Sequence, residues 1–276
     1  MRTAVVVFWL CMTAWLIRYE AFPEYFTQSL AGYRSLLSRD VLVLDSWMKV
    51  MFRNTEIGYS HTNMEINESN PVENYLINNR IQLCFKIIGV QNNVNVLTSA
   101  SLDMTHQLQN FSFSMLSQGH RMSVEGARTE GCTFDVEIKT GSTIERLKID
   151  IPDDVILYAP MTEMAMKHLK PAQQINIRIL GPITMKKANV IVRALRKEPL
   201  ILAGQKHKTT VLAIEYQGME LLTWVDSDGN VLRQEAPFGW TMEKCTPEEA
   251  VAALRDSGDS DDILRTMALQ FFSRDS

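Results

Sequence analysis

Apolar and polar residues alternate along most of the chain between residues 41 and 245. A period of two is typical of β-strands that bury one face. The clearest run covers residues 75–87, where every second position is apolar except Asn79. Segments rich in turn residues separate such runs at intervals of about 10 to 15 residues, which indicates strands joined by hairpins. The pattern therefore predicts a mainly β fold, either a large curved antiparallel sheet or a half-open barrel.

Two polar residues interrupt otherwise apolar faces of this pattern. Asn79 lies within residues 75–87, and Asn92 lies near the start of the next alternating run. A buried amide needs hydrogen-bond partners, which it finds near a strand end or in a cavity that admits water. We expect both side chains to be satisfied near the ends of their strands.

Residues 221–240 are the best-marked hairpin of the chain. An apolar run leads into the polar turn DSDGN, and a second run returns from it. Residues 45–62 have the same form near the start of the β region. We expect Trp224 to be a core residue, Arg233 and Glu235 to be cross-strand surface partners, and this hairpin to be the closing edge of a single curved sheet.

One segment inside the β region has a helical period. Apolar positions recur there at helical spacing after Pro160, and Lys170-Pro171 ends the pattern. We expect a short helix over residues 160–169 to cover the concave face of the sheet, because a sheet with one apolar face needs a cover. Four of its residues then line an apolar groove: Met161, Met164, Ala165 and His168. We favour a packed role for His168 over a ligand role.

The N-terminal region has the pattern of a membrane-targeting segment. Residues 4–17 (AVVVFWLCMTAWLI) carry no charge and lie between Arg2 and Arg18. No motif of small residues follows that would mark a cleavage site. We therefore predict that residues 1–18 are an uncleaved signal anchor in the inner membrane rather than a cleaved signal peptide.

The remaining domain boundaries follow from this anchor. Residues 19–40 are predicted to form an amphipathic spacer on the membrane surface. Residues 41–245 are then a β-rich domain in the periplasm or extracytoplasmic space. Residues 246–276 form a helical tail that begins with the capping box TPEE.

Composition and motif spacing give no support to several functional classes. The formal net charge is −4, so no basic excess favours nucleic acid. The five histidines have no metal-ligand spacing, no phosphate-binding glycine loop is present, and the DSDGN turn lacks the bidentate acid of a calcium loop. Of the histidines, His61 is the best candidate for a placed polar group, and it shares a strand face with Tyr59. We predict no metal and no cofactor.

Cysteine and methionine positions complete the chemical picture. No C-x-x-C pair occurs among the four cysteines, and none of them begins a helix that would activate a thiolate. Cys84 and Cys132 are predicted to be small buried residues, although an oxidising compartment would allow a disulfide between them. Fifteen methionines fill a core or line an adaptable apolar pocket, and the core is the default. We predict that the chain is not an enzyme.

Three short motifs, taken in order, carry a family resemblance. They are D-S-W-M-x-V-x6-I-G-Y-S-H at residues 45–61, L-D at 102–103 followed by F-S-F-S at 111–114, and W-V-D-x-x-G-x-V-L-R-Q-E at 224–235. Residues 41–245 thus resemble the β-rich extracytoplasmic domain that precedes transglutaminase-like domains in bacterial envelope proteins. Such domains are similar in outline to the half-barrel carriers of bacterial lipoprotein sorting. The transglutaminase-like domain has no counterpart in this sequence, so no catalytic residues carry over.

Two functions follow from this resemblance as expectations. The first is a non-catalytic, membrane-anchored envelope module that binds a partner protein, such as a transglutaminase-like protein. The second is a carrier or sensor of an apolar or acyl-chain ligand in the half-barrel groove. An open apolar cavity under the predicted helix would favour the carrier, and a filled core would favour the module.

Overall fold

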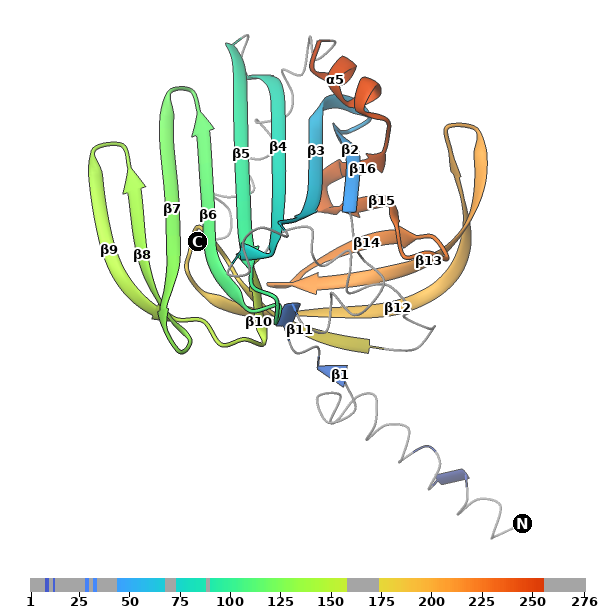
Figure 1. The fold of residues 1–276 in the computed structure, drawn as a ribbon. Coiled ribbons are helices and arrows are strands. Elements are labelled where there is room, and N and C mark those ends of the chain that lie inside the picture. The colour runs from blue at the N-terminus through green and yellow to red at the C-terminus, as the bar shows by residue number, and fades with distance from the viewer. Residues whose placement is uncertain are drawn as a thin grey trace.

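The strands form one strongly curved sheet (Figure 1). The computed structural model describes residues 8–9, 12, 28–29, 32–33, 44–67, 73–87, 90–157 and 174–255. The predicted mainly β fold with a large open curved sheet is confirmed. The predicted helix over residues 160–169 and the tail beyond residue 255 lie outside the described residues.

Short connections join most of the strands along the chain. The bounds of the strands are β1 Gln28–Ser29, β2 Leu44–Phe52, β3 Thr55–Ile66, β4 Tyr75–Ile87, β5 Val90–Leu102, β6 Leu108–Ser117, β7 His120–Glu130, β8 Thr133–Thr140, β9 Thr143–Asp150, β10 Val155–Leu157, β11 Gln174–Leu180, β12 Lys187–Leu202, β13 Gln205–Tyr216, β14 Met219–Val225, β15 Val231–Ala236 and β16 Trp240–Lys244. A 3-10 turn, η3, covers Pro237–Gly239, and the helix α5 covers Pro247–Arg255.

Two antiparallel meanders, β2 to β9 and β11 to β16, make up the sheet. They join where β16 pairs with β2, with Trp240 opposite Phe52 and Lys244 opposite Met48. The sheet therefore ends at β9 on one side and at β1 and β10 on the other, both of which pair with β11 in parallel. The hairpin β14–β15 lies inside the sheet, so the expectation that it forms the closing edge is wrong.

Trp224 of this hairpin is a core residue, as predicted. It is 6% exposed, and its Nε1 donates a hydrogen bond to Oε1 of Glu198 at 3.2 Å. Arg233 stands opposite Trp224 and pairs with Glu235 of its own strand at 2.6 Å. Its cross-strand ion pair is with Glu243 of β16, at 3.1 Å. The predicted Arg233–Glu235 contact therefore exists, but within one strand rather than across two.

The core forms where inner-facing side chains of the two meanders meet. Phe134 and Val136 of β8 and Ile177 and Ile179 of β11 are at most 2% exposed and belong to one apolar cluster. Burying each side chain of this size stabilises the fold by about 1.5–3 kcal/mol relative to leaving it in water. These contacts between opposite halves of the chain hold the sheet in its curved form.

Two glycines allow close approaches within the first meander. A Cβ atom on Gly126 would lie 2.2 Å from the ring of Phe111, so the missing side chain makes room for that ring. A Cβ atom on Gly58 would lie 1.9 Å from the carbonyl oxygen of Gln82. Gly58 belongs to the first of the three family motifs, and it permits the irregular pairing of β2 with β3 at Val50 and Met51.

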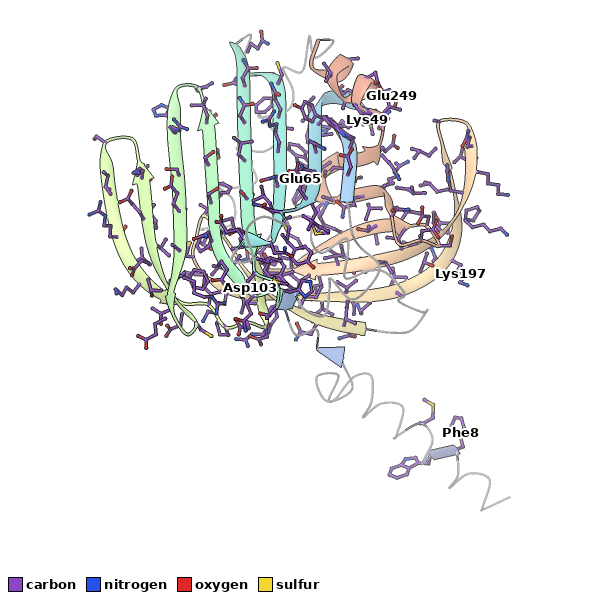
Figure 2. The ribbon with its side chains drawn as sticks, viewed as in Figure 1. Phe8, Lys49, Glu65, Asp103, Lys197 and Glu249 are labelled. Atoms are coloured by element: carbon purple, nitrogen blue, oxygen red, sulfur yellow. The ribbon has the colours of Figure 1, made fainter. Side chains whose placement is uncertain are left out.

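The helix α5 begins with the predicted capping box. The backbone N–H of Thr246 donates to Glu249 Oε2 at 2.9 Å, and the N–H of Glu249 donates to Thr246 Oγ1 at 3.2 Å. Ala250 is fully buried where α5 packs against β2 and β3. Figure 2 shows Glu249 of α5 and Lys49 of β2 at the same end of the molecule.

Part of the segment predicted as a membrane-surface spacer is held by the sheet. Gln28–Ser29 pair with β11, and Tyr33 is 2% exposed within the main apolar cluster. The Tyr33 hydroxyl accepts a hydrogen bond from the backbone N–H of Leu157 at 3.0 Å. Burial raises the pKa of Tyr33 far above its usual value, and this hydrogen bond lowers that pKa by a smaller amount. The rest of residues 19–40 lies outside the described residues.

The predicted anchor is described at three positions. Phe8, Trp9 and Met12 are 67%, 65% and 47% exposed, and Figure 2 shows Phe8 apart from the sheet. Among the residues that the structure describes, no helix has the length and apolar character needed to cross a membrane.

Candidate functional site

The concave side of the sheet contains an apolar cavity of about 430 Å³. Small-molecule sites in proteins occupy about 300–1,000 Å³. The walls of this concave cavity are Ser60, Asn79, Ile81, Val96, Thr98, Phe113, Met115, Gly181, Pro182, Ile183, Thr184, Val190, Ile214, Tyr216, Leu221, Gln234 and Met242.

The first wall consists of inner-facing residues of β3 to β6. The sheet register places Ser60, Ile81, Val96 and Met115 opposite one another in consecutive strands. The neighbouring row runs through Asn79, Thr98 and Phe113 in the same way. The period-two pattern therefore places every second residue of these strands on the cavity, while the residues between them face outward.

The second wall comes from the other meander and a loop. Ile214 of β13 pairs with Leu221 of β14, and Gln234 of β15 pairs with Met242 of β16. The loop between β11 and β12 adds Pro182, which is buried, and Ile183, which is 51% exposed. Hydrogen bonds between the backbones of Gly181, Met185 and Lys186 fix this loop. The loop thus reaches from the cavity wall to the surface of the protein.

Methionine serves both of the roles that the sequence leaves open. Met48 and Met64 are at most 2% exposed in the core. Met115 and Met242 line the cavity from opposite walls and are only partly buried. A flexible thioether adapts to ligands of different shapes, so these two side chains suit a binding site.

Asn79 is the central polar group of the first wall. It is 5% exposed, and its Nδ2 lies 3.1 Å from Ser60 Oγ, 3.1 Å from Thr62 Oγ1 and 3.3 Å from the backbone oxygen of His61. Asn79 is the fifth residue of a 13-residue strand and lines the cavity. The expectation that it is satisfied near a strand end is therefore wrong, because the two neighbouring hydroxyl groups of β3 supply its partners. Asn92 is buried as the third residue of β5, near the end of that strand.

The described lining of the cavity carries no charge. Its polar side chains are hydroxyl groups and amides, and its one titratable group is the phenol of Tyr216. Gln234 Nε2 lies 3.3 Å from Oγ1 of Thr223, its fully buried neighbour on the paired strand. An ionised group that entered this space would find no opposite charge among the described lining residues.

A larger hollow of about 840 Å³ lies on the outer face of β4 to β9. Four of its six charged lining residues form ion pairs: Arg146 lies 2.7 Å from Glu137, and Lys148 lies 3.3 Å from Asp135. Surface pairs of this kind are typical of a solvated sheet face. We therefore consider the smaller concave cavity the better candidate site.

His61 lies on the outer face, away from the concave cavity. Its ring stacks on Trp47 with centroids 3.8 Å apart, and its Nε2 lies 2.7 Å from Asp45 Oδ1. Tyr59 shares this face, as predicted, and donates its hydroxyl hydrogen to Gln82 at 3.1 Å. Ring stacking and one side-chain hydrogen bond thus hold the His61 ring in place, which is a structural role.

The described cysteines are free thiols. The two do not form a disulfide. Cys84 is buried within β4, as predicted, whereas Cys132 is only partly buried in the turn between β7 and β8, so the prediction that it is buried is wrong. Burial raises the pKa of Cys245 to about 11, and the carboxylate of Glu249 adds to this effect. A thiol with so high a pKa is a poor nucleophile at neutral pH.

Two of the three aspartates in the family motifs organise turns. Asp103 Oδ1 accepts hydrogen bonds from the backbone of Thr105 and Gln107, and Oδ2 accepts one from Gln109. Burial raises the pKa of Asp103, but these hydrogen bonds outweigh it and lower the pKa below its usual value. Asp226 accepts hydrogen bonds from Asp228 and Asn230 in the same manner, within the predicted hairpin turn.

The apolar groove that the sequence predicts under residues 160–169 stays a prediction. The predicted groove residues lie outside the described residues: Met161, Met164, Ala165 and His168. No cluster of three or more His, Cys, Asp or Glu side chains suited to a metal occurs in the described parts of the chain. Sequence reasoning missed Thr98, Gln234 and the loop at Gly181. The sequence signal that could have indicated the cavity is a set of polar residues at inner-facing strand positions, which includes Ser60 and Thr98.

Comparisons with known proteins bear on the fold. No protein-family model and no curated protein matches the sequence. Among solved structures, the chain is similar to a β-barrel-like protein of the domain of unknown function DUF1849 from Brucella abortus, with a TM-score of 0.51, 10% identity and coverage of 75% of this chain and 96% of that one.

A second solved structure, a DUF1089 family protein from Pseudomonas aeruginosa, gives a TM-score of 0.33 at 12% identity, over 73% of this chain and 95% of that one. The resemblance to transglutaminase-associated domains is not tested by either structure and stays a prediction. The similarity to the DUF1849 protein supports a β-barrel-like fold for this chain.

Proposed function

We propose that this protein is a non-catalytic carrier or sensor that binds an apolar ligand in the concave cavity. The observation that carries the proposal is the cavity itself, 430 Å³ in volume and lined by apolar side chains and uncharged polar groups. Protein interiors are close-packed and contain few voids larger than a water molecule. A space of this size is therefore better explained as a binding site than as a packing defect.

The proposed setting is the bacterial envelope, with the N-terminal segment as a membrane anchor. Supporting observations are the uncharged run of residues 4–17 and the exposure of Phe8 and Trp9, which are 67% and 65% accessible. Large apolar side chains are costly to leave in water, and a membrane would cover them. A carrier of an apolar molecule also needs to exchange it with a membrane.

A saturable fluorescence titration tests the cavity. N-phenyl-1-naphthylamine fluoresces in apolar surroundings, so the full chain, held in amphipol, is expected to bind it beyond the amphipol blank. Val96→Trp places a large ring in the cavity, and the exposed neighbour Leu97→Trp places the same ring on the outer face. Binding is expected to fall at least tenfold in Val96→Trp and to stay within twofold in Leu97→Trp.

The outcome that overturns the proposal is equal binding by both variants. Circular dichroism and a denaturant midpoint for each variant show that the comparison concerns folded protein. No saturable binding by the native chain would have the same consequence.

Binding of a partner protein is the second candidate function. The observation in its favour is the long β12–β13 hairpin, on which Leu195 and Ile201 are 42% and 71% exposed. Exposed apolar residues of this kind often contact other proteins. A transglutaminase-like protein of the same genome is the proposed partner. Its co-purification with the native chain, lost in Ile201→Ser, would support this function, and unchanged co-purification would contradict a role for the hairpin.

A further inference from the structure

We propose that the ligand of the concave cavity is an uncharged amphiphile, an apolar chain that ends in a neutral group with a hydrogen-bond donor. This inference rests on the proposed function and deepens it by naming the chemical class. Fatty amides, fatty alcohols and monoacylglycerols belong to the class. Ionised fatty acids and phosphate-bearing lipid heads do not.

The orientation of Asn79 carries the first step. The backbone oxygen of His61 only accepts hydrogen bonds, so the nitrogen of the Asn79 amide must face it, at 3.3 Å. The same nitrogen reaches Ser60 and Thr62, both at 3.1 Å. All three of these contacts use Nδ2, so Oδ1 is the atom of this side chain that accepts a hydrogen from a ligand.

The uncharged lining carries the second step. Within the described residues, the cavity offers Ser60, Asn79, Thr98 and Gln234 as polar partners, and it offers no Lys, Arg or His to a carboxylate or phosphate. Moving an unpaired ion out of water is far more costly than moving an amide or hydroxyl that finds a partner. The cavity therefore selects against anions at a pH at which they are ionised.

The volume sets the length of the chain. A water-sized group takes about 30 Å³ in the liquid, so 430 Å³ holds about 14 non-hydrogen atoms. A twelve-carbon chain with an amide or a carboxyl end has that size. Dodecanamide and dodecanoate are thus matched probes that share chain length and size and differ in charge at neutral pH.

Equilibrium dialysis tests the inference. The full chain in amphipol is dialysed against each isotopically labelled probe, and amphipol alone serves as the blank. At pH 8 we expect dodecanamide to bind at least tenfold more tightly than dodecanoate. At pH 5, where part of the carboxylate is protonated, the affinity for dodecanoate is expected to rise at least tenfold and that for dodecanamide to stay unchanged.

Two variants locate the effect. Asn79→Leu removes the acceptor and is expected to reduce the preference for dodecanamide, whereas Thr98→Val keeps Asn79 and serves as the milder cavity variant if Asn79→Leu fails to fold. Leu97→Ala, on the exposed outer face of the same strand, is the control and is expected to bind both probes as the native chain does.

The possible failures are distinguishable. Equal affinities at pH 8, or tighter binding of dodecanoate, would overturn the inference while leaving an apolar ligand in place. Binding of neither probe by the native chain at either pH would overturn the inference and the proposed function together. A dodecanamide preference that survives in a folded Asn79→Leu variant would show that the selection occurs elsewhere. Loss of the preference in Thr98→Val, which keeps Asn79, would show the same.

Discussion

Replacing Tyr33 with Phe removes one hydroxyl group from the core and keeps the ring in place. The hydroxyl accepts the backbone N–H of Leu157 at 3.0 Å, and the Tyr33 side chain is 2% exposed. Without its acceptor, this N–H stays buried and unpaired, which costs about 1–3 kcal/mol. The free energy of unfolding is therefore expected to fall by that amount at pH 7 in Tyr33→Phe, measured by urea denaturation.

The pH dependence gives the same residue a second, independent test. Burial raises the pKa of Tyr33 far above its ordinary value of 10.0. The folded state thus holds the phenolic proton more tightly than the unfolded state, so this contribution to stability is complete below pH 10 and is lost as the pH rises above it. At pH 11, one pH unit above the unfolded pKa, the loss is about 1.4 kcal/mol. Tyr33→Phe lacks this term, so the stability difference between the two proteins shrinks from pH 9 to pH 11.

Two results would refute this reasoning. Unchanged stability of Tyr33→Phe at pH 7 would show that the hydrogen bond to Leu157 does not hold the segment. A stability difference that is the same at pH 9 and pH 11 would show that the phenol is not buried. Either result would contradict the buried contact between Tyr33 and β10.

Three further predictions concern the turns, the packing and the thiols. Asp103→Ala is expected to lower the free energy of unfolding by about 1–3 kcal/mol at pH 7. Because the pKa of Asp103 is lowered in the folded state, the difference from the native chain shrinks as the pH falls through that pKa. Equal losses at pH 7 and pH 3 in urea denaturation would contradict this. Gly126→Ala is expected to cost about 1–3 kcal/mol through its clash with Phe111, and thermal unfolding of Gly126→Ala with Phe111→Leu should recover part of the loss. Cys245 is expected to react with iodoacetamide at pH 8 about 100-fold more slowly in the folded than in the unfolded chain, because its pKa is raised from 9.0 to about 11. Peptide mass spectrometry measures the two reaction rates. Equal rates would contradict the prediction.

Local patterns predict local structure in this chain. The capping box at Thr246 and the turn at Asp226 occur as the sequence predicts, because each depends on residues within four positions of each other. The period of two predicts the strands for the same reason. The short strand β16 lacks this pattern, because its five residues, WTMEK, are all partly or fully exposed.

The cavity depends on pairings that the sequence does not encode locally. Asn79 looks like an isolated polar residue along β4, and only the register with β3 places the hydroxyl groups of Ser60 and Thr62 beside it. Gln234 and Met242 reach the same space from the other end of the chain. The order of strands, above all the joining of β16 to β2, brings these residues together.

The anomalous scattering of a bromine atom tests the central claim most directly. A crystal of the full chain grown with 12-bromododecanamide would place one heavy atom at the end of the bound chain. The account predicts an anomalous peak inside the concave cavity, between Val96 and Met115 on one wall and Ile214 and Met242 on the other. A peak that lies only outside this cavity would contradict the account. The absence of any peak, at a ligand concentration that saturates the protein in solution, would contradict it as well.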